Sequence, residues 1–488
     1  MATEASRSEA SSVEIVERSL YEIRHKIYPR AVSGVFAKWR LYLITFTQAI
    51  FYGMPWLSWN GRQAVLFDLV ERKFYIFGLV LWPQDIIYLT LLLILSALSL
   101  FLFTAIAGRL FCGYACPQTV YTEIFMWIER KVEGDRFARI RLDAEDQPWN
   151  LHKWRIKLTK HALWIAIAFW TGFTFIGYFA PIRELGAAML ALSLGPWQTF
   201  WLFFYSFATW GNAGFLREQV CKHMCPYARF QSVMVDKDTL VVTYDKVRGE
   251  PRGSRGKNVD YKSQGLGDCV DCNICVQVCP TGIDIRDGLQ YMCIGCGGCI
   301  DACDQVMDKL DYPKGLIRYT SERAVVEKLP HKHVLRRILR PRVLIYAAIL
   351  LGLGSLFLGS LLMRTPLRMD IMRDRGALAR EVDGEMIENV FRLHLMNASE
   401  HPLQVSLKAS GLPEIRLLDS QGRKIKTFNV AAASNLLIPL KVRVGIEDVK
   451  PGTYPIHFSV EAKKIDGNKD VMSKVILSDE KSSFIVPK

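Results

Sequence analysis

The sequence has no cysteine after Cys303, although the chain runs to residue 488 and holds twelve cysteines. All twelve lie between Cys112 and Cys303. This distribution excludes a disulfide framework in the C-terminal part. It also predicts that the cysteine-rich part faces a reducing compartment, where free thiols and clusters persist. The first roughly 35 residues lack the short apolar core of a cleavable signal peptide, so we expect none.

Acidic residues are in the minority, with 48 Asp and Glu against 62 Lys and Arg, which gives a net charge of +14. Such a charge could indicate a nucleic-acid partner. Here, however, the basic residues gather beside apolar stretches, as they do in the cytoplasmic loops of membrane proteins. Half of all residues are hydrophobic. We therefore expect the lipid bilayer, and no nucleic acid, as a partner.

Five apolar stretches approach the ~20 residues that a helix needs to cross a bilayer. They cover residues 41–57, 86–107, 162–179, 197–215 and 343–363. Between the first two, residues 60–84 are mixed and aromatic. This composition predicts an interfacial segment with Trp59 and Trp82 at headgroup level.

The distribution of basic residues predicts the orientation. Residues 108–160 contain ten Lys and Arg, whereas residues 181–196 contain only Arg183. Cytoplasmic loops carry the excess of positive charge. The N-terminus and both cysteine-rich parts are therefore predicted to be cytoplasmic, and five spans place the C-terminus outside.

Residues 366–488 have an all-β pattern. Alternating stretches occur at 391–396, 403–408, 425–430, 436–444 and 454–461, separated by glycine-containing turns. Six or seven short strands over this length predict a sandwich of immunoglobulin type. Tyr454 follows a Pro-Gly turn, where either a tyrosine corner or an ordinary strand tyrosine could lie.

The pattern C-x2-C-x2-C-x3-C occurs twice between residues 269 and 303. Three closely spaced cysteines can hold three corners of an iron–sulfur cube, and in two-cluster ferredoxins the fourth ligand comes from the other run. One 4Fe–4S cluster is therefore predicted on Cys269, Cys272, Cys275 and Cys303, and a second on Cys293, Cys296, Cys299 and Cys279. Zinc knuckles need no third cysteine at this spacing, and disulfides need an oxidising compartment. Asp304 follows the second run, where a simple ferredoxin often has proline.

Two further motifs, C-x3-C-P, follow apolar stretches at Cys112/Cys116 and at Cys221/Cys225. Residues four apart share a helix face, and the proline predicts a helix break. Four converging thiols could bind Cu(I), zinc or an iron–sulfur cluster, with Met126, His223 and Met224 as nearby donors. We interpret the four cysteines as metal-binding and catalytic residues. The alternative is that they are buried membrane cysteines with no ligand role.

These patterns together predict a multidomain membrane protein. We expect a polar cytoplasmic segment over residues 1–35 and a helical membrane domain with four spans over 36–229. A cytoplasmic ferredoxin-like domain with two 4Fe–4S clusters follows over 230–340. A fifth span over 341–365 leads to an external immunoglobulin-like β domain over 366–488.

Nearly the whole chain resembles one family, the cytochrome oxidase accessory proteins called CcoG, FixG or RdxA. The resemblance rests on the following motifs: residues 27–30 (IYPR), 61–63 (GRQ), 83–85 (PQD), 109–118 (RLFCGYACPQ), 221–231 (CKHMCPYARFQ), the doubled cysteine run and 373–376 (RDRG). The C-x3-C-P motifs alone also resemble membrane ferredoxin subunits of nitrate and nitrous-oxide reductase systems. The β domain and the order of spans favour the first family.

The resemblance implies a membrane polyferredoxin of the bacterial inner membrane whose C-terminal domain is periplasmic. It further implies reduction of Cu(II) to Cu(I), with copper as substrate or transient ligand, and a role in assembling a cbb-type cytochrome oxidase with its assembly factors or subunits. The electron donor is not identified by any motif. Two other functions stay open, namely a quinol-linked electron relay subunit and a non-enzymatic assembly scaffold.

Overall fold

The computed structural model describes residues 26–144, 146, 148–256, 260–328, 339–374, 379–382, 384–425, 427–464 and 476–487. Most of the predicted polar N-terminal segment, up to residue 25, lies outside the described residues. The chain forms two compact units. One contains Met1–Gln48, Ser99–Thr171 and Phe203–Ala347, and the other contains Ala49–Leu98, Gly172–Leu202 and Ala348–Lys488.

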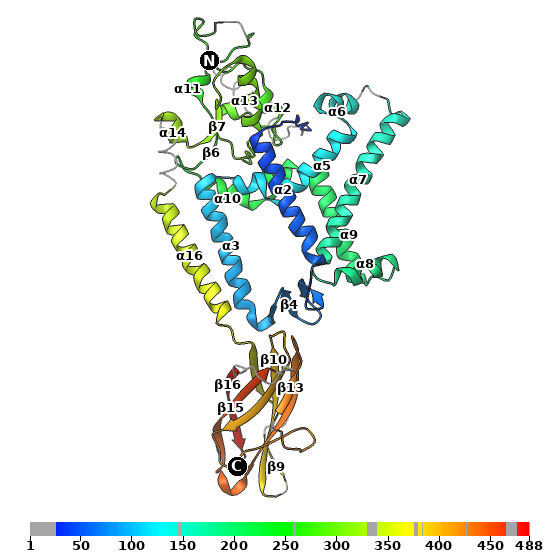
Figure 1. Cartoon of the computed structure of the whole chain (residues 1–488), viewed down its shortest axis with the longest axis vertical. Coiled ribbons are helices and arrows are strands. Elements are labelled where there is room, and N and C mark those ends of the chain that lie inside the picture. Colours follow the sequence, from blue (N-terminus) through cyan, green and yellow to red (C-terminus); the bar gives the residue numbers. More distant parts are fainter. Residues whose placement is uncertain are drawn as a thin grey trace, which may run out of the picture. The chain divides into compact units, whose positions relative to one another are not determined.

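Each predicted apolar span is helical over most of its length. The helices are α2 (Val35–Gly53), α3 (Ile86–Ala107), α7 (Leu151–Ile176), α9 (Pro196–Gly211) and α16 (Pro341–Leu362) (Figure 1). Within the described residues, the helical stretches Pro83–Ala107 and Pro341–Leu362 are long and apolar enough to cross a membrane. α2 and α7 begin earlier than predicted, in basic sequence, and α9 is short at 16 residues.

Residues 58–81, in the second unit, form short antiparallel strands. These are β1 (Ser58–Trp59) paired with β2 (Arg62–Gln63), and a meander of β3 (Val65–Asp68), β4 (Lys73–Ile76) and β5 (Leu79–Leu81). Trp59 is exposed, as an interfacial tryptophan would be. Trp82, in contrast, is 4% exposed and packs with Val80, Met396 and Ala398, while the position of both tryptophans at headgroup level stays a prediction. Its indole fills an apolar core under the meander.

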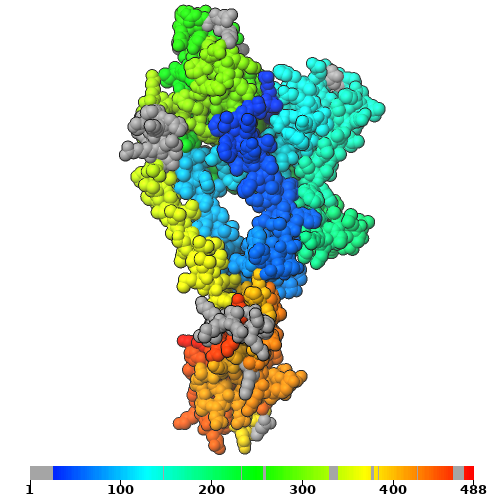
Figure 2. Space-filling view, in the orientation of Figure 1, coloured from blue at the N-terminus to red at the C-terminus, as the bar shows by residue number. Residues whose placement is uncertain are grey.

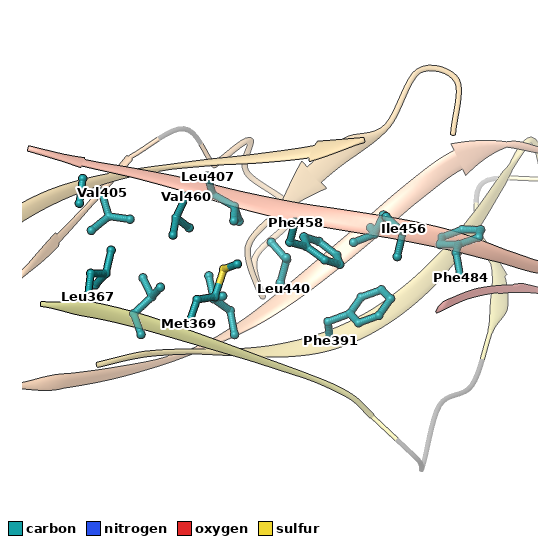
Figure 3. Close-up of a cluster of buried hydrophobic side chains, with 14 of the residues drawn as sticks. Leu367, Met369, Phe391, Val405, Leu407, Leu440, Ile456, Phe458, Val460 and Phe484 are labelled. Carbon is teal, nitrogen blue, oxygen red and sulfur yellow. The ribbon is translucent and has the colours of Figure 1, made fainter. Parts of the chain in front are cut away.

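The C-terminal part is a two-sheet sandwich, as predicted. One sheet has the order β12 (Arg416–Leu418), β14 (Asn435–Gly445), β10 (Met386–Asn397) and β8 (Leu367–Arg373), with β9 (Arg380–Val382) beside β10. The other has the order β13 (Thr427–Val430), β11 (Leu403–Ser410), β15 (Gly452–Lys464) and β16 (Ile476–Val486). Alternating side chains of both sheets fill the core between them (Figure 3).

Tyr454 makes the bond that defines a tyrosine corner. Its hydroxyl donates to the carbonyl of Lys450 at 3.0 Å and accepts from the amide of Lys450 at 3.1 Å. This bond back to the backbone a few residues upstream resolves the alternative left open by the sequence in favour of the corner.

The cysteine-rich part belongs to the first unit. A two-stranded antiparallel sheet of β6 (Val241–Tyr244) and β7 (Ile317–Thr320) packs with α12 (Ile274–Gln277) and α13 (Gly298–Leu310). The shorter helices are α4 (Leu110–Tyr114), α5 (Pro117–Val132), α6 (Arg136–Asp143), α8 (Ile182–Leu190), α10 (Pro226–Met234), α11 (Lys246–Gly249) and α14 (Glu322–Val326). Two π-helical segments, η3 (Asn212–Leu216) and η4 (Val220–Met224), follow α9.

Candidate functional site

Each of the two cysteine runs forms a loop that leads into a helix. In the first run α12 begins at Ile274, directly before Cys275, and in the second α13 begins at Gly298, directly before Cys299. Gly297 precedes α13 with φ of +73°, and a Cβ at this position would lie 2.7 Å from the Phe36 ring. Only glycine fits this left-handed conformation and this close approach. Gly297 therefore allows the loop of the second run to turn tightly before α13.

The fourth cysteine of each run has the other run as its neighbour. Burial, with a smaller contribution from the nearby thiols of Cys275, Cys269 and Cys272, raises the pKa of the Cys303 thiol to about 12. Burial likewise raises the pKa of Cys293 to about 12, with Cys296 and Cys279 adding to the effect. These neighbours match the exchange of fourth ligands that the spacing predicts.

The surroundings of the second set of cysteines fit an iron–sulfur cluster. Cys279, Cys293, Cys296 and Cys299 line one small cavity together with Cys275 and the apolar side chains of Ile283, Ile285 and Ile294. Bound iron requires these buried thiols to be deprotonated, so cluster binding and folding are coupled. Among the residues that the structure describes, no three His, Cys, Asp or Glu side chains converge closely enough to hold a single metal ion.

The start of α2 is held by the second cysteine run. The Asp301 carboxylate accepts hydrogen bonds from the amides of Phe36 at 3.2 Å and Ala37 at 2.8 Å. It thereby satisfies two amides at the helix N-terminus, which have no partner within the helix. Figure 2 shows this blue part of α2 against the green cysteine-rich segment. Sequence reasoning missed Asp301, whose only signal is its place between Cys299 and Cys303.

Both C-x3-C-P motifs break the helix at the proline, as predicted. Pro117 begins α5, with Cys116 as the extended residue before it. Pro226 begins α10, with Cys225 in the same position. Proline suits the first turn of a helix because its missing N–H would have no partner there. The two motifs therefore repeat one local structure.

The four thiols of these motifs share a partly buried environment. Burial raises the pKa of Cys112 to about 12, with Cys116, Cys221 and Cys225 as neighbouring thiols. Burial raises that of Cys221 to about 11, with Cys116 and Cys225 as neighbours. The Cys112 thiol donates to Oε1 of Gln231, at 3.3 Å. Of the further donors suggested by the sequence, Met126 is buried, whereas His223 and Met224 are exposed.

The first of these motifs contacts the second cysteine run directly. A Cβ on Gly113 would lie 2.8 Å from the carbonyl oxygen of Ile294 and 3.1 Å from Cα of Cys296. The Tyr114 hydroxyl donates to the carbonyl of Cys296 at 3.2 Å. The two residues after Cys112 therefore touch the backbone of a predicted cluster ligand.

Three family models match the chain. A 4Fe-4S dicluster domain covers residues 216–322, a 4Fe-4S binding domain covers residues 89–133, and an IG-like fold at the C-terminal of FixG covers residues 357–487. The chain thus carries 4Fe–4S binding domains and an immunoglobulin-like C-terminal domain. The shorter 4Fe–4S match contains Cys112 and Cys116.

Curated relatives match over most of the chain. Nitrogen fixation protein FixG of Rhizobium meliloti is 38% identical over 467 residues, covering 88% of each chain. Protein RdxA of Cereibacter sphaeroides is 39% identical, covering 81% of this chain and 85% of its own. A crystal structure of a FixG-related protein from Vibrio parahaemolyticus is 20% identical with a TM-score of 0.20, covering 25% of this chain and 97% of that one.

Proposed function

Because the chain belongs to the FixG and RdxA family of iron–sulfur proteins, we propose that it is a membrane-bound reductase that passes electrons from two 4Fe–4S clusters to Cu(II). The first cluster uses Cys269, Cys272, Cys275 and Cys303, and the second uses Cys279, Cys293, Cys296 and Cys299. Bound clusters supply one-electron chemistry. Each iron already has its thiolate, so copper needs other ligands.

The contact between α4 and the second cysteine run carries this proposal. Gly113 and Tyr114 touch the backbone around Cys296, and Cys112 is the residue before them. Cys293, Cys296, Cys299 and Cys279 would hold the second cluster, and the motif of Cys112 and Cys116 lies directly beside their loop. The four thiols of the C-x3-C-P motifs would then offer copper a site next to that electron source. Soft thiolates favour Cu(I) over Cu(II), so these ligands also favour the reduced product.

The proposal includes a topology and a destination for the copper. Five helices cross the bacterial inner membrane, with the clusters in the cytoplasm and the β domain in the periplasm. The abundance of Lys and Arg in residues 108–160 supports this orientation. The Cu(I) produced is delivered to a cbb-type cytochrome oxidase during assembly, through its assembly factors or subunits.

Two measurements on anaerobically purified protein test the function. Two cubane clusters require about eight iron and eight acid-labile sulfide per chain. Replacing Cys112 and Cys116 by serine is expected to leave that content unchanged and to lower both Cu(II) reduction and copper retention. Stoichiometric zinc without sulfide would contradict the clusters, and undiminished reduction without all four thiols would contradict the copper site.

A third cluster on the four thiols is the second candidate, because a 4Fe–4S binding model covers Cys112 and Cys116. In that arrangement the motifs relay electrons instead of meeting copper. Iron content separates the two. Loss of iron in the double serine variant, from a wild-type content above eight per chain, would favour the relay.

A further inference from the structure

One cavity of the first unit has no cysteine among the residues that line it. It has a volume of about 730 Å³ and is bordered by α5, α7, η3 and the segment before α2. Its walls combine charged groups with the rings of Tyr28, Trp149, His161, Trp164 and Phe215. Pockets that bind small molecules typically have such ring-lined walls with a few placed polar groups.

The charges in this wall are largely neutralised by one another. Lys160 pairs with Glu133 at 2.9 Å, Arg217 with Glu129 at 2.6 Å, and Lys157 with both Glu133 and Asp143. A phosphate headgroup would need cations not already committed to carboxylates, and it would meet the carboxylates as like charges. The wall therefore suits a neutral ligand with hydroxyl or carbonyl oxygens.

Two buried nitrogen atoms beside Phe215 have no hydrogen-bond partner among the described residues. They are Nδ1 of His161, whose ring lines the cavity, and Nε1 of Trp210, whose ring packs against Phe215. Their rings surround Phe215, which stacks on His161 at 5.9 Å and lies edge-on to Trp210 at 4.8 Å. An unsatisfied buried polar atom costs about 1–3 kcal/mol, so a ligand oxygen here would be stabilised.

The backbone beside these nitrogen atoms is irregular. Phe215 belongs to the π-helical segment η3, and Arg217 after it has φ of +41°. Single π-helical turns occur often at functional sites, and a non-glycine residue at positive φ carries strain. Phe215 itself lines both the cavity and a groove on the outer face of α9.

That outer face has an apolar groove. The groove has a volume of about 420 Å³ and is lined by Phe207, Ala208, Trp210, Gly211, Asn212, Phe215 and Leu216. Phe215 lines both the groove and the cavity, so the apolar groove adjoins the cavity with its polar groups at this one side chain. This combination fits a small redox-active ring that carries a long hydrocarbon tail.

The cavity also reaches the cluster-binding part. Ile27 lines the cavity, and its Cδ1 lies 2.8 Å from where a Cβ of Gly282 would be. Gly282 is three residues beyond Cys279, a predicted ligand of the second cluster. One side chain therefore separates the cavity from a cluster-binding loop.

We propose that this cavity binds an isoprenoid quinol and that the quinol is the electron donor of the protein. The ring lies against Phe215, and its oxygens hydrogen-bond to Trp210 Nε1 and His161 Nδ1. Oxidation to the quinone releases two electrons and two protons. Bound 4Fe–4S clusters would accept one electron each, and His161 and the wall carboxylates would pass the protons to water. The inference rests on the proposed function, in which two Cu(II) then accept the electrons.

The test uses the full chain in detergent under anaerobic conditions, with its clusters oxidised. Decylubiquinol is added, and cluster reduction is followed by loss of visible absorbance. The variant Trp210→Phe keeps the ring and removes the donor, so quinol-driven reduction at subsaturating quinol is expected to fall about tenfold. Ala208→Leu fills the groove and is expected to weaken the response similarly, while Ala348→Leu on α16 is the matched control with no effect.

Dithionite separates this inference from the function on which it rests. In all three variants, dithionite is expected to reduce the clusters fully, and the reduced protein is expected to reduce Cu(II) at the wild-type rate. Wild-type protein that responds to dithionite and not to decylubiquinol would overturn the quinol site alone. An equal response of all variants to decylubiquinol would also overturn the quinol site. So would a result in which decylubiquinol displaces bound anionic phospholipid but transfers no electrons.

Discussion

Gly113 is the residue at which the C-x3-C-P motif meets the second cysteine run. Because backbone atoms of Ile294 and Cys296 lie 2.8–3.1 Å from its missing Cβ, an added methyl has no flexible side chain to displace. Gly113→Ala is therefore expected to destabilise this contact by about 1–3 kcal/mol through overpacking. We expect reduced iron at the second cluster and slower Cu(II) reduction, measured by iron analysis and a Cu(I) chelator assay.

A second glycine in a helix provides the control. Gly352 in α16 has nothing within 4 Å of its Cβ position, so Gly352→Ala is expected to leave both quantities unchanged. Full iron content and wild-type reduction in Gly113→Ala would show that α4 does not depend on this close approach.

Site residues that belong to a short motif with fixed spacing could be predicted from the sequence. Site residues that are brought together only by tertiary contacts could not. The cysteines and the two prolines follow short patterns whose geometry is set by neighbouring residues. Asp301, His161 and Trp210 have no such pattern. Asp301 binds α2 across 264 positions of sequence, and Trp210 meets His161 only because α7 and α9 pack together.

Strand β10 contains a buried carboxylate whose role can be measured. Glu388 is fully buried and bonds to Arg380 of β9 at 2.8 Å and to Arg443 of β14 at 2.7 Å. Burial alone would raise the pKa of Glu388, but the hydrogen bonds from Arg443 and Arg380 outweigh it and lower the pKa. Glu388→Gln is expected to reduce the stability of the β domain by about 2 kcal/mol, measured by urea titration with pulse proteolysis.

The sign of the pH dependence follows from that lowered pKa. A depressed carboxyl pKa stabilises the folded state above the unfolded value, near about 4.3, and the contribution is lost as pH falls below it. The difference between wild type and Glu388→Gln should therefore stay nearly constant from pH 7 to about 5 and shrink as the pH is lowered below about 4. Glu461→Gln, which breaks the exposed pair with Lys408, is the control, with an expected change below about 1 kcal/mol. Equal losses for both variants would contradict the role of burial.

Elements with a strong period were predicted well, and those with mixed composition were not. β11, β14 and β15 alternate between buried and more exposed positions over much of their length, and they were located in the sequence together with β10 and β13. β8, β9, β12 and β16 were not located. Residues 58–81 alternate only over two to four positions, and their strands are stabilised by contacts such as the ion pair of Arg62 with Glu400 at 2.8 Å. Such pairing between distant segments leaves no local pattern.

At the scale of the whole molecule, the charge distribution makes a testable prediction about topology. Residues 108–160 carry ten basic residues on α4 to α7, while the segment containing α8 carries only Arg183. Positive loops are retained in the cytoplasm, so the two segments should lie on opposite sides of the membrane. α16 is apolar over 22 residues and should carry the chain across once more.

Fusions of a fluorescent protein and of alkaline phosphatase after residue 260 are expected to be fluorescent and inactive, respectively. The same fusions after residue 192 and at the C-terminus should give the reverse. A cytoplasmic signal from both residue 260 and the C-terminus would rule out five spans, and with them a periplasmic β domain.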